Sequence, residues 1–325
     1  HKMEYSKLGR SGLQVSKLCL GTMNLGKLVD EKASFSILDA ALDAGINFID
    51  TANVYGGISN RGRTEEIIGK WMSQRSDLRS KIVLATKVYG KMGEGVNERG
   101  LSAFHIRDAC EESLKRLKTD HIDLHQMHHI DRTTSWEEIW QAMEQLFQSG
   151  KIIYNGSSNF AAWHIIEAQL TAKSRNFLGI VSEQSLYNLT NRMIELEVIP
   201  ACKKYGIGII PWSPLAEGML AGILNDNTGM RKKTEIVKKK LALQLKQVED
   251  YEKFCLSIDK NPEAVAIAWL LKNPVISSII IGPRTVQQVH GMIEAVQTQL
   301  NEEEIQELEK IWPGLGGEAP EAYAW

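Results

Sequence analysis

The sequence lacks most features that would indicate nucleic acid, a membrane or secretion. Its 38 basic residues are balanced by 40 acidic ones, for a formal net charge of −2, so it has no positive excess of the kind that binds nucleic acid. No apolar run approaches the roughly 18 residues of a membrane span, and the first residues show no hydrophobic signal segment. We therefore expect a cytoplasmic protein without nucleic-acid or membrane partners.

Cysteine is scarce as well. Cys19, Cys110, Cys202 and Cys255 are scattered and form no CxxC pair, a usage typical of reduced cysteines that pack in a core. His1-Lys2 precede Met3 and are expected to be a cloning remnant outside a single domain of residues 3–325.

Motifs for metals and phosphates are also absent. There is no HExxH, and the histidine-rich segment 121–129 has the apolar spacing of a strand. The odd separation of His125 and His128 would put these two rings on opposite faces of that strand. Gly26-Lys27 and Gly150-Lys151 are not followed by the Ser or Thr of a P-loop. We expect no metal site.

The chain does contain a regular alternation of short apolar runs with amphipathic helical segments. Continuously apolar strands between such helices favour a parallel sheet covered by helices. Eight pairs, without GxGxxG in the first strand–helix turn, favour a (β/α)8 TIM barrel, in the α/β class, over a doubly wound sheet. A hairpin at residues 3–16 precedes the barrel, and extra C-terminal helices are expected. The expected strands are 18–20, 47–50, 82–86, 122–127, 152–157, 180–184, 208–212 and 278–281, and the helices are 30–44, 63–72, 102–117, 135–149, 161–173, 194–205, 262–272 and 285–295.

Four residues carry the candidate chemistry. Asp50 ends an apolar strand, Tyr55 follows in a loop, and Lys87 and His128 follow two later strands. Strand carboxyl ends meet at one rim of a barrel, where a buried carboxylate needs a cation. A phenol beside that ion pair is a candidate acid with a lowered pKa, and a histidine can bind a developing oxyanion. Two plainer interpretations stay open: Asp50 caps a turn while Tyr55 packs, and Lys87 reaches solvent. None of these groups can deliver hydride, so a cofactor must do so.

The ordered motifs of the chain resemble those of the aldo-keto reductase superfamily, over nearly the whole length. They are Leu8-Gly-Arg-Ser-Gly-Leu13, Cys19-Leu-Gly-Thr22, the segment 45–55, Ala85-Thr-Lys87, Asp123-Leu-His-Gln-Met-His128, Gly156-Ser-Ser-Asn-Phe160, Gln184-Ser-Leu-Tyr-Asn188, Pro211-Trp-Ser-Pro-Leu-Ala216 and Ile281-Gly-Pro-Arg-Thr285. Each motif alone is modest, but their common order is specific. The chain differs in having His129 and Ile130 where Arg and Pro are common, which would reshape the substrate side.

The resemblance implies a barrel that binds NADPH without a Rossmann fold, with Asp50, Tyr55, Lys87 and His128 as the catalytic residues. Ser158, Asn159 and Gln184 would hold the carboxamide and Trp212 would stack on the nicotinamide. Residues 213–220 would wrap the pyrophosphate, and Arg284 would meet the adenosine phosphate, as suits a basic residue near a helix start. The implied cofactor contacts are Gly21, Thr22, Met23, Asp50, Ser158, Asn159, Gln184, Trp212, Ser213, Pro214, Leu215, Ala216, Gly218, Leu220, Gly282, Arg284 and Gln288.

The predicted activity is NADPH-dependent reduction of an aldehyde or ketone, with the proton from Tyr55. The substrate is a small carbonyl compound, and the resemblance of the tail to bacterial relatives hints at a sugar derivative. An oligomer is compatible with the sequence. The alternative is a regulatory subunit of the potassium-channel β type, which shares the barrel; some such subunits lack the histidine that is His128 here. The insert 225–246, with Arg231-Lys-Lys233 and Lys238-Lys-Lys240, is expected to be a solvated helix face or else a mobile cover.

Overall fold

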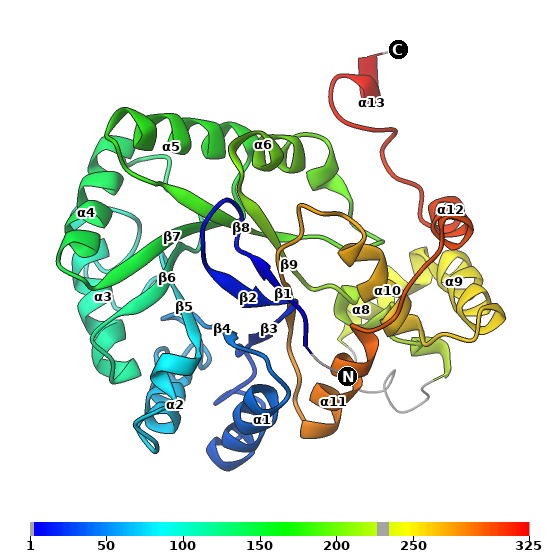
Figure 1. The fold of residues 1–325 in the computed structure, drawn as a ribbon, viewed down its shortest axis with the longest axis horizontal. Helices are drawn as coiled ribbons and strands as arrows, with labels where there is room; N and C mark the ends of the chain where they lie inside the picture. The colour runs from blue at the N-terminus through cyan, green and yellow to red at the C-terminus, as the bar shows by residue number, and fades with distance from the viewer. Residues whose placement is uncertain (1–2, 226–233, 325) are drawn as a thin grey trace.

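The fold is a nearly closed barrel of eight parallel strands surrounded by helices (Figure 1). The computed structural model describes residues 3–225 and 234–324, so His1-Lys2 and Arg231-Lys-Lys233 of the sequence analysis lie outside the described residues. The strand order is β10-β3-β4-β5-β6-β7-β8-β9, and a parallel bridge between Ile209 and Ile276 joins the last strand to the segment before the first. The predicted (β/α)8 architecture is confirmed.

The strands coincide closely with the predicted apolar runs. They are β3 (Leu18–Gly21), β4 (Phe48–Asp50), β5 (Val83–Val88), β6 (Ile122–Met127), β7 (Ile152–Ser158), β8 (Ile180–Leu186), β9 (Gly208–Trp212) and β10 (Ile279–Ile281). β5 continues past its predicted end at Thr86, so Lys87 lies within the strand. Its side-chain direction is therefore set by the pleat of the sheet.

Several helices begin at a side-chain cap. Asp30 accepts a hydrogen bond from Ala33 N (2.8 Å), and Ser102 does the same for His105 N (3.0 Å), which satisfies amide groups in the first turn. The helices are α1 (Glu31–Asp43), α2 (Arg63–Met72), α3 (Ala103–Leu117), α4 (Trp136–Gln148), α5 (Ala162–Ser174), α6 (Val198–Tyr205), α8 (Glu235–Leu243), α9 (Leu245–Ser257), α10 (Pro262–Leu271), α11 (Val286–Ala295), α12 (Glu302–Ile311) and α13 (Glu321–Ala324).

One predicted helix starts in the wrong place. The helical spacing predicts a start at Ile194, but residues 193–195 form a 3-10 turn and α6 begins at Val198. Pro200 explains the difference: proline has no N–H and disfavours helical geometry in the preceding residue, so it is tolerated in the first turn of a helix and not in its interior.

The interior of the barrel has an apolar lower layer. It is closed at the amino ends of the strands by a small antiparallel hairpin, β1 (Tyr5–Lys7) and β2 (Gln14–Ser16), which Figure 1 shows across the centre of the barrel. Arg10 in its turn donates to the backbone carbonyls of Ile180 (2.7 Å) and Tyr205 (3.2 Å). The lower layer consists of Leu8, Val15, Cys19, Phe48, Val83, Ala85, Leu124, Val181 and Ile210, all buried.

The extra helices lie in the insert after β9 and at the C-terminus. α8 carries Lys238, Lys239 and Lys240 on a largely exposed side, but Lys240 Nζ lies 3.6 Å from Glu217 Oε1 in the segment after β9. The solvated-face and the cover interpretations of the insert therefore both stay open. The chain after α12 passes the turn before α6, where Ala319 N donates to Leu196 O (3.0 Å), and Figure 1 shows α13 at the periphery. None of the described helices is long and apolar enough to cross a membrane.

Candidate active site

The polar upper layer of the barrel interior follows from strand periodicity. Side chains two residues apart on a strand point to the same face. Asp50 therefore lies above Phe48, Lys87 above Ala85, and Gln126 above Leu124. The carboxyl ends of the strands thus gather buried polar groups over the apolar layer.

Asp50 and Lys87 form a buried ion pair at the centre of this layer. Lys87 Nζ lies 2.7 Å from Asp50 Oδ2, and the two residues are only 1 % and 2 % exposed. The other carboxylate oxygen, Oδ1, accepts from Gln126 Nε2 (2.8 Å) and Gln184 Nε2 (3.1 Å). Full hydrogen bonding of both charges is what makes their burial tolerable. The interpretation in which Lys87 extends to solvent is wrong.

Tyr55 is brought to the ion pair by a tight loop after β4. Its backbone carbonyl accepts from Gly62 N and Thr64 N (3.2 and 3.3 Å). The next residue, Gly56, has φ 130°, and a Cβ there would lie 2.3 Å from Asn60 O, so only glycine fits. The loop thereby fixes the direction in which the phenol enters the barrel mouth.

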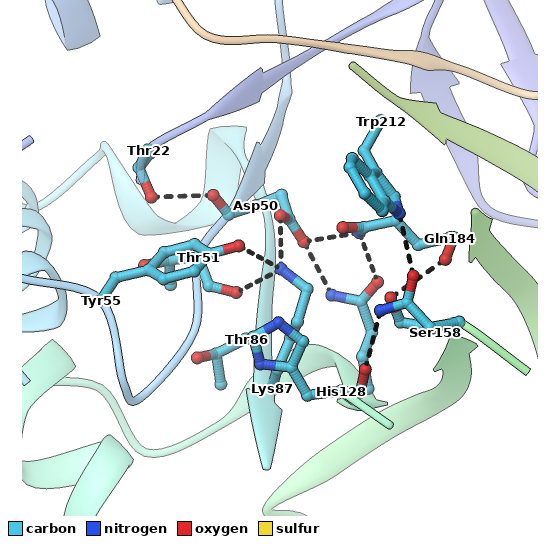
Figure 2. A network of polar contacts seen from close by, with 12 residues as sticks. Thr22, Asp50, Thr51, Tyr55, Thr86, Lys87, His128, Ser158, Gln184 and Trp212 are labelled. Atoms are coloured by element: carbon cyan, nitrogen blue, oxygen red, sulfur yellow. Dashed lines mark hydrogen bonds and ion pairs between the residues drawn. The ribbon is translucent and has the colours of Figure 1, made fainter. Parts of the chain in front are cut away.

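Lys87 donates to three acceptors, as Figure 2 shows. They are Asp50 Oδ2 (2.7 Å), Thr51 O (3.0 Å) and Tyr55 OH (3.2 Å). An ammonium group has three N–H donors, so all of them are used. The hydroxyl of Tyr55 is the acceptor in its contact with Lys87, which leaves its own O–H free to donate elsewhere.

The expected lowering of the Tyr55 pKa is wrong in this structure. Burial raises the pKa of Tyr55 above 10.0 and outweighs the lowering by Lys87. Burial would lower the pKa of Lys87, but Asp50 and Tyr55 raise it above its ordinary value. At neutral pH the phenol is therefore protonated beside a charged ammonium.

His128 completes the group at the end of β6. Its backbone N–H donates to Val88 O (2.9 Å), and its carbonyl accepts from Asn159 Nδ2 (3.2 Å). Its ring meets that of Tyr55 edge to face, with centroids 6.0 Å apart. Burial, with the charge of Lys87, lowers the pKa of His128 to about 3, so the imidazole is neutral and carries one N–H. The structure thus brings the four predicted catalytic residues together.

The residues predicted to hold the carboxamide and nicotinamide lie beside the ion pair (Figure 2). Ser158 Oγ donates to Gln184 O (3.0 Å), and Trp212 Nε1 donates to Asn159 Oδ1 (3.1 Å). Trp212 is half-buried at the end of β9. The four side chains, from three neighbouring strand ends, form one continuous polar and aromatic wall.

The backbone is strained along this wall. Asn159, Ser213, Ala216 and Glu217 all have φ between 52° and 58°, a region that residues other than glycine seldom adopt. Such strain collects at binding sites, where the surrounding structure holds it. The segment 213–220, including Pro214, Leu215, Gly218 and Leu220, follows β9 at the barrel mouth.

The remaining predicted contacts lie at the ends of β3 and β10. Thr22 is buried, and its hydroxyl donates to Asp50 O (2.8 Å), whereas Met23 is exposed. Gly21 pairs with Asp50 in register, and Asn24 Nδ2 reaches Gly282 O (3.4 Å).

Arg284 and Gln288 are exposed at the start of α11, where Arg284 N donates to Gln288 Oε1 (2.7 Å). A helix start with an adjacent guanidinium suits a phosphate.

Two contacts of the site were missed by the sequence analysis. Gln126 bonds Asp50 and accepts from Gln184 Nε2 (3.0 Å), and Thr51 supplies its backbone carbonyl to Lys87. Gln126 could have been found, since it is two residues after the inward-facing Leu124. The role of Thr51 could not, because any residue carries a carbonyl there.

Comparison with known proteins agrees with the fold. The model of the aldo/keto reductase family matches residues 17–313. Among the described residues, no group of three or more His, Cys, Asp or Glu side chains is placed to hold a metal ion.

Similar curated proteins match over nearly their whole lengths. "Uncharacterized oxidoreductase YrpG" of Bacillus subtilis is 52% identical over 99% of this chain and 100% of its own. "Putative aryl-alcohol dehydrogenase C977.14c" of Schizosaccharomyces pombe is 36% identical over 94% of this chain and 95% of its own. A rice (Oryza sativa subsp. japonica) "Probable voltage-gated potassium channel subunit beta" is 35% identical over 90% of this chain and 91% of its own. The chain belongs to the aldo/keto reductase family and is an oxidoreductase.

Proposed function

We propose that this protein reduces an aldehyde or ketone to an alcohol with NADPH, and that Tyr55 gives the proton. The observation that carries the proposal is the use of all three Lys87 donors, which makes Tyr55 an acceptor toward Lys87 and leaves its O–H for a substrate. The family to which the chain belongs supports carbonyl reduction in general.

The chemistry of the site fits a nicotinamide dinucleotide. NADPH would supply hydride to the carbonyl carbon. Ser158, Asn159 and Gln184 would bind the carboxamide, and the half-buried indole of Trp212 would stack on the ring. The strained segment 213–218 would bind the pyrophosphate, with further contacts from Gly21, Thr22 and Met23.

The phosphate of the adenosine end would lie at the start of α11, beside Arg284, Gln288 and Gly282. Arg284 takes part in no ion pair among residues 3–225 and 234–324, so its guanidinium is free to pair with a 2′-phosphate. This feature favours NADPH over NADH.

Proton donation from Tyr55 would be supported by the buried charge beside it. As the phenol loses its proton to the carbonyl oxygen, the Lys87 ammonium, 3.2 Å away, stabilises the phenolate. Asp50 holds Lys87 in place and keeps it charged. Burial keeps Tyr55 protonated until that moment, because it raises the pKa.

His128 would orient the substrate. Its low pKa of about 3 makes it a neutral donor, which can hydrogen-bond a carbonyl oxygen that also approaches Tyr55. A neutral imidazole would not compete with Tyr55 as an acid.

A regulatory role of the channel-subunit type is the second candidate. A relative named as a potassium-channel β subunit matches this chain over 90% of its length. The presence and placement of His128 favour an enzyme. The two are separated by an assay of NADPH oxidation with a panel of aldehydes, ketones and keto-sugars, including benzaldehydes. Turnover of none of them, at a protein concentration where NADPH binding is measurable, would contradict the proposed activity.

A further inference from the structure

A second polar cluster lies on the rim beside His128. β6 and β7 are neighbours, and Met127 pairs with Ser157. Four residues after His128 the chain reaches Arg132, and four residues after Asn159 it reaches Trp163. Both segments leave the carboxyl ends of adjacent strands, so they stand next to each other. We call Arg132, Trp163 and His164 the rim cluster.

The contacts within the rim cluster hold the guanidinium of Arg132 over an exposed indole. Its Cζ lies 5.1 Å from the centroid of the Trp163 ring, and the rings of Trp163 and His164 are 4.0 Å apart. Trp163 is 54% exposed, which is unusual for so large an apolar group. Among the described residues only Nε of this guanidinium makes a hydrogen bond, so its two terminal amino groups are left for a ligand.

Arg132 has no carboxylate partner in the part of the chain that the structure describes. Arg63, Arg116, Arg175 and Arg192, by contrast, each pair with a glutamate. The acid adjacent to Arg132, Asp131, is committed elsewhere. Its oxygens accept from Leu101 N (2.9 Å), Thr133 N (3.0 Å) and Thr134 Oγ1 (2.9 Å).

Among the described residues, the one side-chain acceptor that Arg132 reaches is a poor one. Arg132 Nε faces His164 Nε2 at 2.9 Å, while Ala161 N faces His164 Nδ1 at 3.0 Å. A neutral imidazole accepts at one nitrogen only, because the other carries hydrogen. Two N–H donors therefore compete for one acceptor. The rim cluster has more donors than acceptors.

We propose that the rim cluster is a substrate subsite for an oxyanion, in particular a carboxylate, remote from the carbonyl that is reduced. This inference rests on the proposed function, since it names the class of substrate for that reaction. A carboxylate accepts two parallel N–H bonds from the guanidinium and supplies the missing acceptor. The exposed indole of Trp163 adds an apolar face for a ring that links the two ends of the substrate.

The length of chain between the two sites bounds the substrate. Four residues span at most about 14 Å, so the Cα atoms of His128 and Arg132 cannot be farther apart. The substrate class is therefore aldehydes or ketones that carry an acid group several bonds away, with an aryl or sugar ring between.

The test compares 4′-formylbiphenyl-4-carboxylate with its methyl ester, which has a similar shape without the charge. Wild-type protein should show a kcat/KM about tenfold higher for the acid, the size expected for a charge-assisted pair. Arg132→Gln should bring the ratio close to unity, mainly through KM. Arg132→Lys should restore part of it. Lys173→Gln removes one exposed charge at the far end of α5, the helix that carries Trp163 and His164, and should leave the ratio unchanged.

Calorimetry with the two product alcohols provides a readout that needs no turnover. The acid should bind wild-type protein about tenfold more tightly than the ester, and Arg132→Gln should abolish the difference. Equal affinities for acid and ester in wild type, or a preference that survives in Arg132→Gln, would overturn the subsite. Absence of turnover with every carbonyl compound would instead contradict the reductase activity, and the binding result would still decide the subsite.

Discussion

The lower and upper layers of the barrel interior are built on the same strands, two residues apart, and differ in every chemical respect. The lower layer around Phe48 and Ala85 is apolar, sealed by the hairpin, and needs no hydrogen bonds. The upper layer around Asp50 and Lys87 is charged, and each charge has a partner. Apolar burial stabilises a fold, whereas a buried ion pair often contributes little or nothing to stability. The lower layer therefore maintains the barrel, whereas under the proposed function the upper layer serves the reaction.

The most disruptive test of this division is Phe48→Ala, directly below Asp50. Phe48 is fully buried, so the free energy of unfolding should fall by about 3–5 kcal/mol, from lost burial and the cavity left behind. At a temperature where the variant is folded, the Kd for NADPH should change little. Urea unfolding and a cofactor titration check both statements.

The milder Phe48→Leu variant is the control, since it keeps most of the apolar volume and should lose much less stability. A Phe48→Ala variant that is as stable as wild type but has lost cofactor binding would refute the division of roles between the layers.

The converse test is Tyr55→Phe in the upper layer. Removing one hydroxyl and keeping the ring should lower kcat by at least the roughly 10²-fold that a general acid contributes, while NADPH still binds. Tyr5→Phe, on the distant hairpin, removes a hydroxyl that donates to Gly45 O after α1; it is the matched control and should keep full activity. A Tyr55→Phe enzyme with more than a tenth of wild-type kcat would eliminate Tyr55 as the donor.

The two layers were not equally predictable from the sequence. The apolar runs and the period of two place Phe48, Ala85 and Leu124 inward, and the same period carries Asp50 and Lys87 to the mouth. Alternation with helices is a repeated signal, so the barrel and its strands were predicted nearly to the residue. The start of α6 was missed because the local effect of Pro200 was not weighed against the helical spacing.

What the sequence could not provide depends on depth and on backbone direction. The sign of the Tyr55 pKa shift is a balance between burial and the charge of Lys87, and the depth of the phenol is a property of the folded loop. The strained φ values at Ser213 and Glu217 have no sequence signal, since neither residue is glycine. The rim cluster depends on the loop after β6 and the start of α5, which meet only in space.

A smaller effect is expected at the rim, away from the buried layer. Arg284→Ala should weaken the binding of NADPH by about 1.5–3 kcal/mol, the value of a charged hydrogen bond to phosphate. NADH, which has no 2′-phosphate, should bind almost as before. Arg107→Ala, an exposed arginine on α3, is the control. Equal losses for both cofactors would assign Arg284 a structural role.

The smallest effect concerns a polar group buried outside both layers. His125 lies between Leu124 and Gln126 on β6 and so faces the helices; burial lowers its pKa to about 4. Between that value and the ordinary pKa of about 6.5, the unfolded chain binds a proton that the folded chain does not. The stability that depends on His125 is therefore fully present above pH 6.5 and is lost as pH falls toward 4, at up to about 1.4 kcal/mol per pH unit for this one group.

The His125→Gln variant should show a shallower fall of Tm between pH 7 and pH 5 than wild type. His290→Gln, which replaces an exposed histidine on α11, should not. Parallel curves of Tm against pH for wild type and His125→Gln would show that this buried imidazole, like the apolar residues around it, does not contribute to the pH dependence of stability.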